Sequence, residues 1–385
     1  MTIDTGSTAW ILLSTATLTL VAPGLGLFYG GMADKKNILS TIAYGILVYC
    51  MVTLAWSMIG FSLAFGNSTI AKGFIGDCTY CWLRGISLTT ESSYAPSVPF
   101  AAHFFYQTAV AGMSAILFIS ALIGRLRTAF IILITTAYIL AIYSIVTYWI
   151  RNTDGWLNKL GVLDFGGGSF VHIVSGFAAL GSHHYLGEGK NKMYKHSSSS
   201  ISMTLIGTGL LWLGWMGLNG GASTASGQVT AVALTNTQLA ACAGALSFAF
   251  LQYIYNDSPH VLGICSGAIC GLTSITAGAG YVSLWSALVI GCIGSILTYM
   301  YCHYKTLHFG EMRDSLDVFG CHGISGAWGS IAVGLFATPD SGSDFSGLFY
   351  GGGRQFGVNL LGVVVCAAYG FFVTWMNLFI CERLL

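Results

Sequence analysis

The feature that most constrains this chain is the length of its uncharged segments. Residues 197–256 run for 60 positions without a charged side chain, and only the polar stretch 219–227 interrupts them. A helix needs about 20 mainly apolar residues to cross a bilayer, so this segment holds two such helices and a turn. Only 8% of the 385 residues are charged, against about 25% in soluble domains. The sequence therefore predicts an all-α polytopic membrane protein.

The same composition excludes several other classes of protein. So few charges cannot cover the surface of a cytosolic globular enzyme or keep a chain disordered. A net charge of +1 provides no basic surface for nucleic acid, so we expect no nucleic-acid partner. The 51 glycines favour helices that pack closely against one another.

Similar apolar segments predict eleven membrane-spanning helices. They form a single transmembrane domain over residues 1–385, and the longest stretch expected outside the membrane is 66–99. The predicted helices begin near Ser7, Ile38, Phe100, Thr128, Phe165, Ile201, Gln228, His260, Ser283, Val318 and Gln355.

The basic residues predict the orientation of these helices. Because eleven is an odd number, the two termini should lie on opposite sides of the membrane. Lysine and arginine concentrate in cytoplasmic loops. If the N-terminus lies outside, ten of these basic residues lie on the cytoplasmic side and five on the outer side. We therefore expect a protein of the cell membrane with its C-terminus in the cytoplasm. The inner set is Lys35, Lys36, Arg125, Arg127, Lys190, Lys192, Lys195, Lys305, Arg313 and Arg383, and the outer set is Lys72, Arg84, Arg151, Lys159 and Arg354.

Two histidine motifs indicate an internal repeat. Residues 172–176 (HIVSG) and 322–326 (HGISG) both read His-x-x-Ser-Gly, 150 residues and five predicted helices apart. An odd number of helices between them requires two inverted repeats, which are common in transporters. We place the repeats at about residues 7–187 and 200–338, followed by a final helix at about 355–385.

The histidines of these motifs, His172 and His322, would lie at membrane depth. Ionisable residues are rare there and usually line a pathway. Two unrelated structural histidines, each bonded to a backbone carbonyl, are the alternative, but the matched motifs favour a functional pair. Asp164 and Asp317 precede the two motifs, where we expect each to cap its helix. No nucleophile or metal-binding set accompanies the histidines, so we expect no enzyme, cofactor or metal site.

Cys78 and Cys81 form a CxxC pair in the stretch 66–99. Such a pair can be a redox centre, half of a zinc site or a local disulfide. No second pair or nearby histidine supports zinc, so a disulfide that fastens the loop is favoured.

Five segments carry motifs of a known family: 23–31 (PGLGLFYGG), 155–164 (GWLNKLGVLD), 164–172 (DFGGGSFVH), 265–268 (CSGA) and 317–323 (DVFGCHG). Together they resemble the ammonium transporter (Amt/Mep/Rh) family over the whole chain. The resemblance implies a homotrimer in membrane lipid with one narrow pore per subunit. It also implies that His172 and His322 touch the pore and each other and bind NH4⁺ or NH3.

The chain departs from this family at the outer end of the pore. The family holds a cation with Trp, Phe and Ser above two stacked Phe. The two gate positions fall on Val110 and Leu218, and the Trp and Ser positions fall on Arg151 and Ala222. Arg151 would repel a cation if it points into the vestibule, whereas it has no such effect if it extends to lipid headgroups. Four neighbours are further candidates for lining the vestibule or pore: Tyr106, Trp149, Trp215 and Ser223.

These departures, and a chain that ends directly after the last predicted helix, favour an ammonium sensor or receptor module with poor or no flux. Its partner would be a signalling domain fused beyond the C-terminus and absent from this sequence. The alternatives are an ammonium transporter that conducts NH4⁺ or NH3 and a Rh-like channel for neutral gas.

Overall fold

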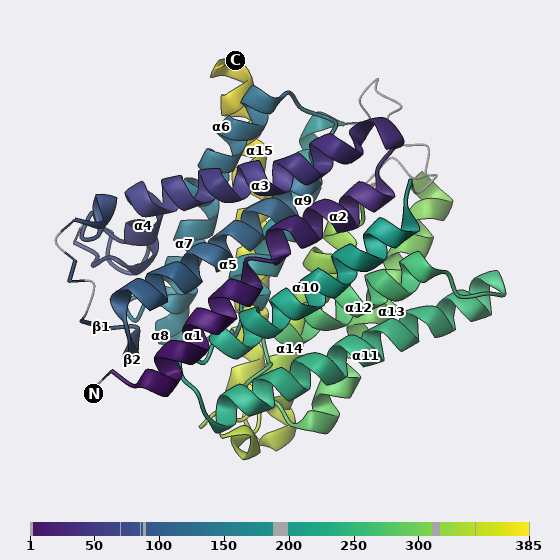
Figure 1. Cartoon of the computed structure of the whole chain (residues 1–385). Coiled ribbons are helices and arrows are strands. Elements are labelled where there is room, and N and C mark those ends of the chain that lie inside the picture. The colour runs from purple at the N-terminus through teal and green to yellow at the C-terminus, as the bar shows by residue number, and fades with distance from the viewer. Residues whose placement is uncertain are drawn as a thin grey trace.

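The computed structural model describes residues 3–69, 71–84, 86–87, 90–187, 199–309, 316–342 and 344–384. Within these residues, helices lie side by side in one bundle, and the two termini lie at different ends of it (Figure 1). Four of the basic residues used to predict the orientation lie outside the described residues: Lys190, Lys192, Lys195 and Arg313.

Helices dominate the described structure. The α-helices are α1 (Thr5–Leu18), α2 (Val21–Met32), α3 (Ile38–Ala55), α4 (Phe61–Phe65), α5 (Phe100–Ser120), α6 (Thr128–Tyr138), α7 (Ser144–Arg151), α8 (Trp156–Leu160), α9 (Val174–Leu186), α10 (Ile201–Gly221), α11 (Gln228–Asn256), α12 (Val261–Thr276), α13 (Leu284–Phe309), α14 (Ser325–Phe336) and α15 (Gly353–Leu384). Four π-helical segments adjoin them: Trp56–Gly60, Ile139–Tyr143, Gly168–Ile173 and Phe319–Ile324. Short 3₁₀ turns occupy Lys35–Asn37, Cys81–Leu83, Pro339–Ser341 and Leu348–Tyr350.

Among the described residues, eight helical stretches are long and apolar enough to cross a membrane. The predicted segments near Phe165, His260 and Val318 instead contain the shorter helices α9, α12 and α14. The structure therefore supports a polytopic helical protein, and the number eleven stays a prediction. The eight stretches are Thr5–Met32, Lys35–Phe65, Phe100–Ser120, Thr128–Leu160, Ile201–Gly221, Gln228–Asn256, Leu284–His308 and Gly353–Leu384.

The first of these stretches consists of two helices. The carboxylate of Asp4 accepts a hydrogen bond of 2.6 Å from the backbone N–H of Ser7 and so caps α1. Hydrogen bonds from Ser7 lower the pKa of Asp4 below its usual value. The chain bends after Leu18 and continues as α2, whose first turn holds Pro23. Proline fits there because the first turn of a helix needs no backbone N–H donor.

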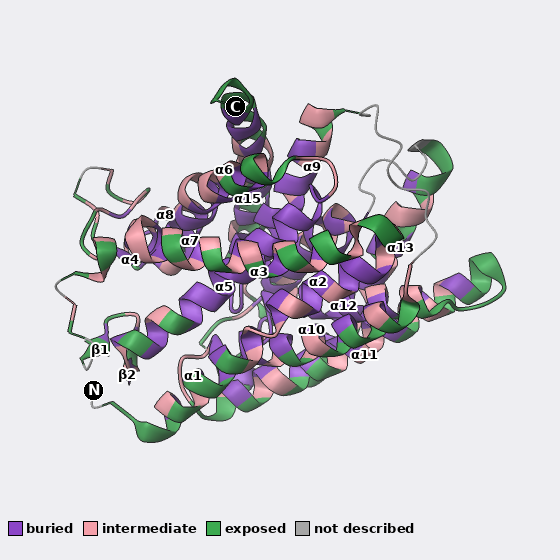
Figure 2. Ribbon diagram, turned by 45° about the horizontal axis from the view of Figure 1, so that its top comes forward, coloured by how far each residue is buried: buried purple, intermediate pink, exposed green. Residues whose placement is uncertain are grey.

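Apolar side chains cover the outside of the bundle as well as its core. Along α3, Leu39, Ile46 and Leu54 are 80%, 56% and 65% exposed, and buried residues gather toward the centre (Figure 2). Contiguous exposed apolar surface of this kind is rare on soluble monomers. It suits a protein whose surroundings are lipid.

The N-terminus, the stretch 66–99 and the turn after α10 meet at one end of the bundle, called here the N-terminal face. The backbone N–H of Asp4 donates to the carbonyl of Ser97, and the Ser97 hydroxyl donates to the carbonyl of Thr224, both at 2.9 Å. This face also holds a small antiparallel sheet of β1 (Glu91–Ser92) and β2 (Ala95–Pro99). The all-α expectation did not include this sheet.

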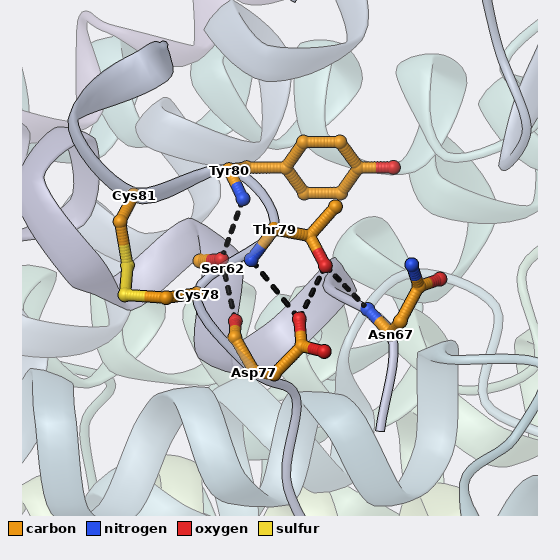
Figure 3. The surroundings of a disulfide bond; sticks show 7 residues. All are labelled: Ser62, Asn67, Asp77, Cys78, Thr79, Tyr80 and Cys81. Carbon is orange, nitrogen blue, oxygen red and sulfur yellow. Dashed lines mark hydrogen bonds between the residues drawn. A yellow bond between two sulfur atoms is a disulfide. The ribbon is translucent and has the colours of Figure 1, made fainter. Parts of the chain in front are cut away.

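A disulfide joins Cys78 and Cys81 on the same face (Figure 3). The hydroxyl of Ser62, in the first turn of α4, donates to the carbonyl of Asp77 at 2.6 Å and accepts from the N–H of Tyr80 at 2.8 Å. The disulfide loop is therefore tied to the helical bundle through Ser62. This is the pairing that the spacing of the two cysteines favoured.

Candidate functional site

Two histidine rings stack on each other in the interior of the bundle. His172 lies in the π-helical segment that leads into α9, and His322 lies in the one that leads into α14. Their ring centroids are 5.3 Å apart and the ring planes differ by 20°. Trp215 of α10 stacks on His172 at 5.2 Å and lies 6.3 Å from His322. All three side chains are fully buried. Isolated π-helical turns often occur at functional sites.

Three of the four imidazole nitrogens have no hydrogen-bond partner among the described residues. They are Nδ1 and Nε2 of His172 and Nε2 of His322. The fourth, Nδ1 of His322, lies 3.3 Å from the hydroxyl of Thr273 on α12. Trp215 adds no partner, because its indole N–H donates to Thr276 Oγ1 at 2.9 Å. Buried polar atoms are normally hydrogen-bonded, so the free nitrogens make this pair a candidate binding site for a small polar molecule.

The glycine at the end of each motif explains how the two rings come so close. A Cβ on Gly176 would lie 2.2 Å from the backbone nitrogen of Gly323, which follows His322. A Cβ on Gly326 would lie 2.9 Å from the Cβ of His172. Each glycine therefore packs against the histidine segment of the other motif. Any larger side chain would push the two segments apart, because backbone atoms occupy the space.

The two aspartates upstream of the motifs have different roles. The carboxylate of Asp164 accepts hydrogen bonds of 2.7–2.8 Å from the N–H groups of Gly167, Gly168 and Ser169, which begin the π-helical segment of His172. Asp317 does not cap its helix as expected. Its backbone is left-handed, with φ +53°, and Lys305 of α13 donates to its carboxylate. The left-handed turn and the lysine together account for the difference.

A cavity of about 370 Å³ opens at the N-terminal face, between Arg151 and the first turn of α11. A smaller cavity of about 10 Å³ shares Arg151, Phe165 and Ala222 with it. The Arg151 guanidinium donates to the carbonyl of Phe165 at 3.5 Å. Arg151 therefore lines both cavities, which favours the alternative that points it into the vestibule.

The other residues expected at the outer end divide into two groups. Val110 and Tyr106 line the smaller cavity, and Ser223 lines the larger one. Leu218 is fully buried, and its carbonyl accepts a hydrogen bond from Tyr106. Trp149 takes no part in either cavity, which corrects the expectation: its indole N–H donates to the carbonyl of Phe74 at 2.9 Å, and its ring packs on Tyr369.

Two residues beside the histidines and the smaller cavity were not predicted from the sequence. Thr273 is the hydrogen-bond neighbour of His322, and Gln107 lines the smaller cavity. Helices of this chain contain many buried hydroxyl residues, so nothing in the pattern marks Thr273. Gln107 could have been identified from the sequence, because a side-chain amide in an apolar helix needs a hydrogen-bond partner.

A helical bundle with an apolar exterior defines a polytopic membrane protein, and the buried pair of histidines with free nitrogens is its candidate internal site. Residues 9–385 match the Ammonium Transporter Family, and the chain belongs to this family.

Relatives and solved structures agree with this assignment. Ammonium transporter Amt1 of Archaeoglobus fulgidus is 36% identical over 370 residues, which cover 96% of this chain and 90% of the relative. The crystal structure of Candida albicans Mep2 matches with a TM-score of 0.91 and 31% identity, over 99% of this chain and 85% of that one. A structure described as a Sensor Amt Protein matches over 98% of this chain and 93% of its own, with a TM-score of 0.88, but at 22% identity it shows a common fold alone.

Proposed function

We propose that this chain moves ammonium across the cell membrane as ammonia and that His172 and His322 form the selective site of its pore. The observation that carries the proposal is the buried, stacked pair with three ring nitrogens free. The name of the Archaeoglobus fulgidus relative, an ammonium transporter, supports the same substrate.

The chemistry of the pair suits ammonia better than other small solutes. Each neutral imidazole presents one donor and one acceptor nitrogen. Ammonia can therefore donate to one ring and accept from the other. Na⁺ and K⁺ need several oxygen ligands in place of their water, and His172, His322 and Trp215 offer none. A bare ammonium ion would meet a large desolvation penalty here, so its proton leaves at or above the histidines.

Arg151 gives the vestibule a positive charge and so favours the neutral form. At 4 Å, repulsion between two unit charges is about 1 kcal/mol in bulk water and about 4 kcal/mol at an effective dielectric constant of 20. This repulsion lowers the free-energy cost of releasing a proton to water for an ammonium ion that approaches Arg151. Ammonia passes this point without an electrostatic penalty.

A sensor with poor or no flux is the second candidate. Two observations favour it: a fixed charge in the vestibule and a space of only about 10 Å³ in the next cavity. Such a protein would bind ammonium near the histidines and pass the signal to a fused domain. The two candidates share the site and differ in whether the bound molecule moves on.

We also propose the finer architecture that the family resemblance implies. It comprises two inverted repeats of five spans each, at about residues 7–187 and 200–338, and a final eleventh span at about 355–385, with the N-terminus outside. The reciprocal packing of Gly176 and Gly326 supports the repeats. The exposed apolar faces supply area both for lipid and for the contacts of a homotrimer.

The test is a flux measurement on the full chain in proteoliposomes, followed with an internal pH dye and with electrodes, alongside calorimetric titration of ammonium. His172→Ala and His322→Ala should abolish the ammonium-dependent signal, because each removes ring nitrogens of the site. His308→Ala is the matched control, since His308 is exposed at the end of α13. Sustained, histidine-dependent flux supports transport. Binding without flux supports the sensor, and unchanged binding and flux in both site variants would refute the assignment.

A further inference from the structure

The stretch 66–99 on the N-terminal face contains a sequence that can carry a glycan. Residues 67–69 read Asn-Ser-Thr, and residues 256–258 read Asn-Asp-Ser. These are the two Asn-x-Ser/Thr sequences of the chain, and such a sequence is the acceptor for an N-linked oligosaccharide. Three matching residues also occur by chance. The position of each sequence in the fold therefore decides whether it can act.

The folded structure leaves the acceptor side chain of Asn67 free. Asn67 and Thr69 are both exposed. The backbone of Asn67 is fixed to the disulfide loop, because its N–H donates to Thr79 Oγ1 at 3.3 Å and its carbonyl accepts from the N–H of Asp77 at 2.6 Å. Its carboxamide makes none of the hydrogen bonds drawn in Figure 3. A large substituent on Nδ2 would therefore break no hydrogen bond drawn there.

The helical stretch before Asn67 lifts it clear of the hydrocarbon. Residues Lys35–Phe65 form a stretch of 31 residues, which is about 46 Å long at 1.5 Å per residue. The hydrocarbon core is about 30 Å thick, and the lysines at the start of the stretch favour the headgroup level. The excess of about 16 Å places Asn67, two residues beyond Phe65, in the aqueous phase.

The disulfide and the second sequence distinguish the two sides of the membrane. Disulfides persist in oxidising compartments, so Cys78–Cys81 indicates that the N-terminal face lies outside the cytoplasm. Asn256 is exposed at the far end of α11. The first residue of that helix, Gln228, lines the vestibule cavity, about 42 Å away along the helix axis. The two acceptor sequences therefore lie on opposite sides.

We propose that Asn67 is the acceptor of an N-linked glycan on the outer face of this protein and that Asn256 is not modified. The proposal rests on the orientation given under the proposed function, with the N-terminus outside. The donor is an oligosaccharide linked to a lipid pyrophosphate. The sugar C1 bonds to Nδ2 of Asn67, the bond from C1 to the pyrophosphate oxygen breaks, and the amide loses one proton as the lipid pyrophosphate leaves.

The experiment follows the gel mobility of the full chain after synthesis with microsomes of the endoplasmic reticulum, before and after treatment with peptide N-glycosidase. The wild type should show the shift of one glycan, and the glycosidase should remove it. Asn67→Gln and Thr69→Ala should each abolish the shift, because either change destroys the acceptor sequence. Thr69→Ser keeps the hydroxyl and should retain the shift. Asn256→Gln is the matched control and should also retain it.

Resistance to alkaline extraction identifies the inserted chains, and only these are compared. An inserted wild type without a glycan, or a shift that persists in Asn67→Gln, would overturn the proposal. A shift that disappears in Asn256→Gln instead would overturn the orientation as well. The measurement involves no ammonium, so its failure leaves the flux test of His172 and His322 standing. Equally, an absence of flux with an intact shift would refute transport alone.

Discussion

Replacing Gly176 by alanine should separate the two histidines. The new Cβ would lie 2.2 Å from N and 2.4 Å from Cα of Gly323. Ordinary contacts begin at 3.4 Å, so the backbone beside His322 must retreat by about 1.2 Å, the difference between 3.4 and 2.2 Å. Overpacking of this kind costs about 1–3 kcal/mol, and better helix propensity returns about 1 kcal/mol. We expect a net destabilisation of up to about 2 kcal/mol.

The same displacement should impair the site itself. Hydrogen bonds weaken beyond about 3.2 Å, so one molecule can no longer bridge rings moved apart by about 1 Å. Loss of one bond predicts flux lower by about three- to tenfold. Thermal unfolding in detergent and flux in proteoliposomes measure the two effects. Gly209→Ala is the control, because a Cβ there meets nothing within 4 Å. If Gly176→Ala matches this control in both measurements, the packing argument is wrong.

Three further predictions test the vestibule and the peripheral contacts. Arg151→Gln removes about 1 kcal/mol of repulsion and should lower half-saturation by ammonium about fivefold; an unchanged value would mean that the charge does not act on the route. Lys305→Met should lower the thermal unfolding midpoint more than Lys159→Met, because the Lys305 side chain is 7% exposed and the Lys159 side chain is 52% exposed; equal midpoints would contradict this. Cys81→Ser removes the disulfide, which stabilises the fold by about 2 kcal/mol through chain entropy, and should speed proteolysis of residues 66–99 without changing flux. A loss of flux would show that the stretch 66–99 shapes the pore.

Local signals in the sequence predicted much of this molecule. Long uncharged runs indicate helices in lipid wherever they occur, because the bilayer imposes length and polarity on each span separately. The repeated motif identified His172 and His322, since its spacing can be read without knowing the fold. Asp164 could be predicted for the same reason: a cap acts on backbone groups three to five residues away.

What the sequence alone determined is the membrane class, the histidine pair and the position of the loop disulfide. The tertiary structure decided where the ambiguous side chains point. Arg151 could extend to lipid or into the vestibule, and Trp149 could line the vestibule or pack elsewhere, because direction depends on how each helix is rotated against its neighbours. Asp317 pairs with Lys305, and Gly176 approaches Gly323, only because segments distant in the chain are brought together. These contacts depend on packing between helices, which no pattern along a single helix contains.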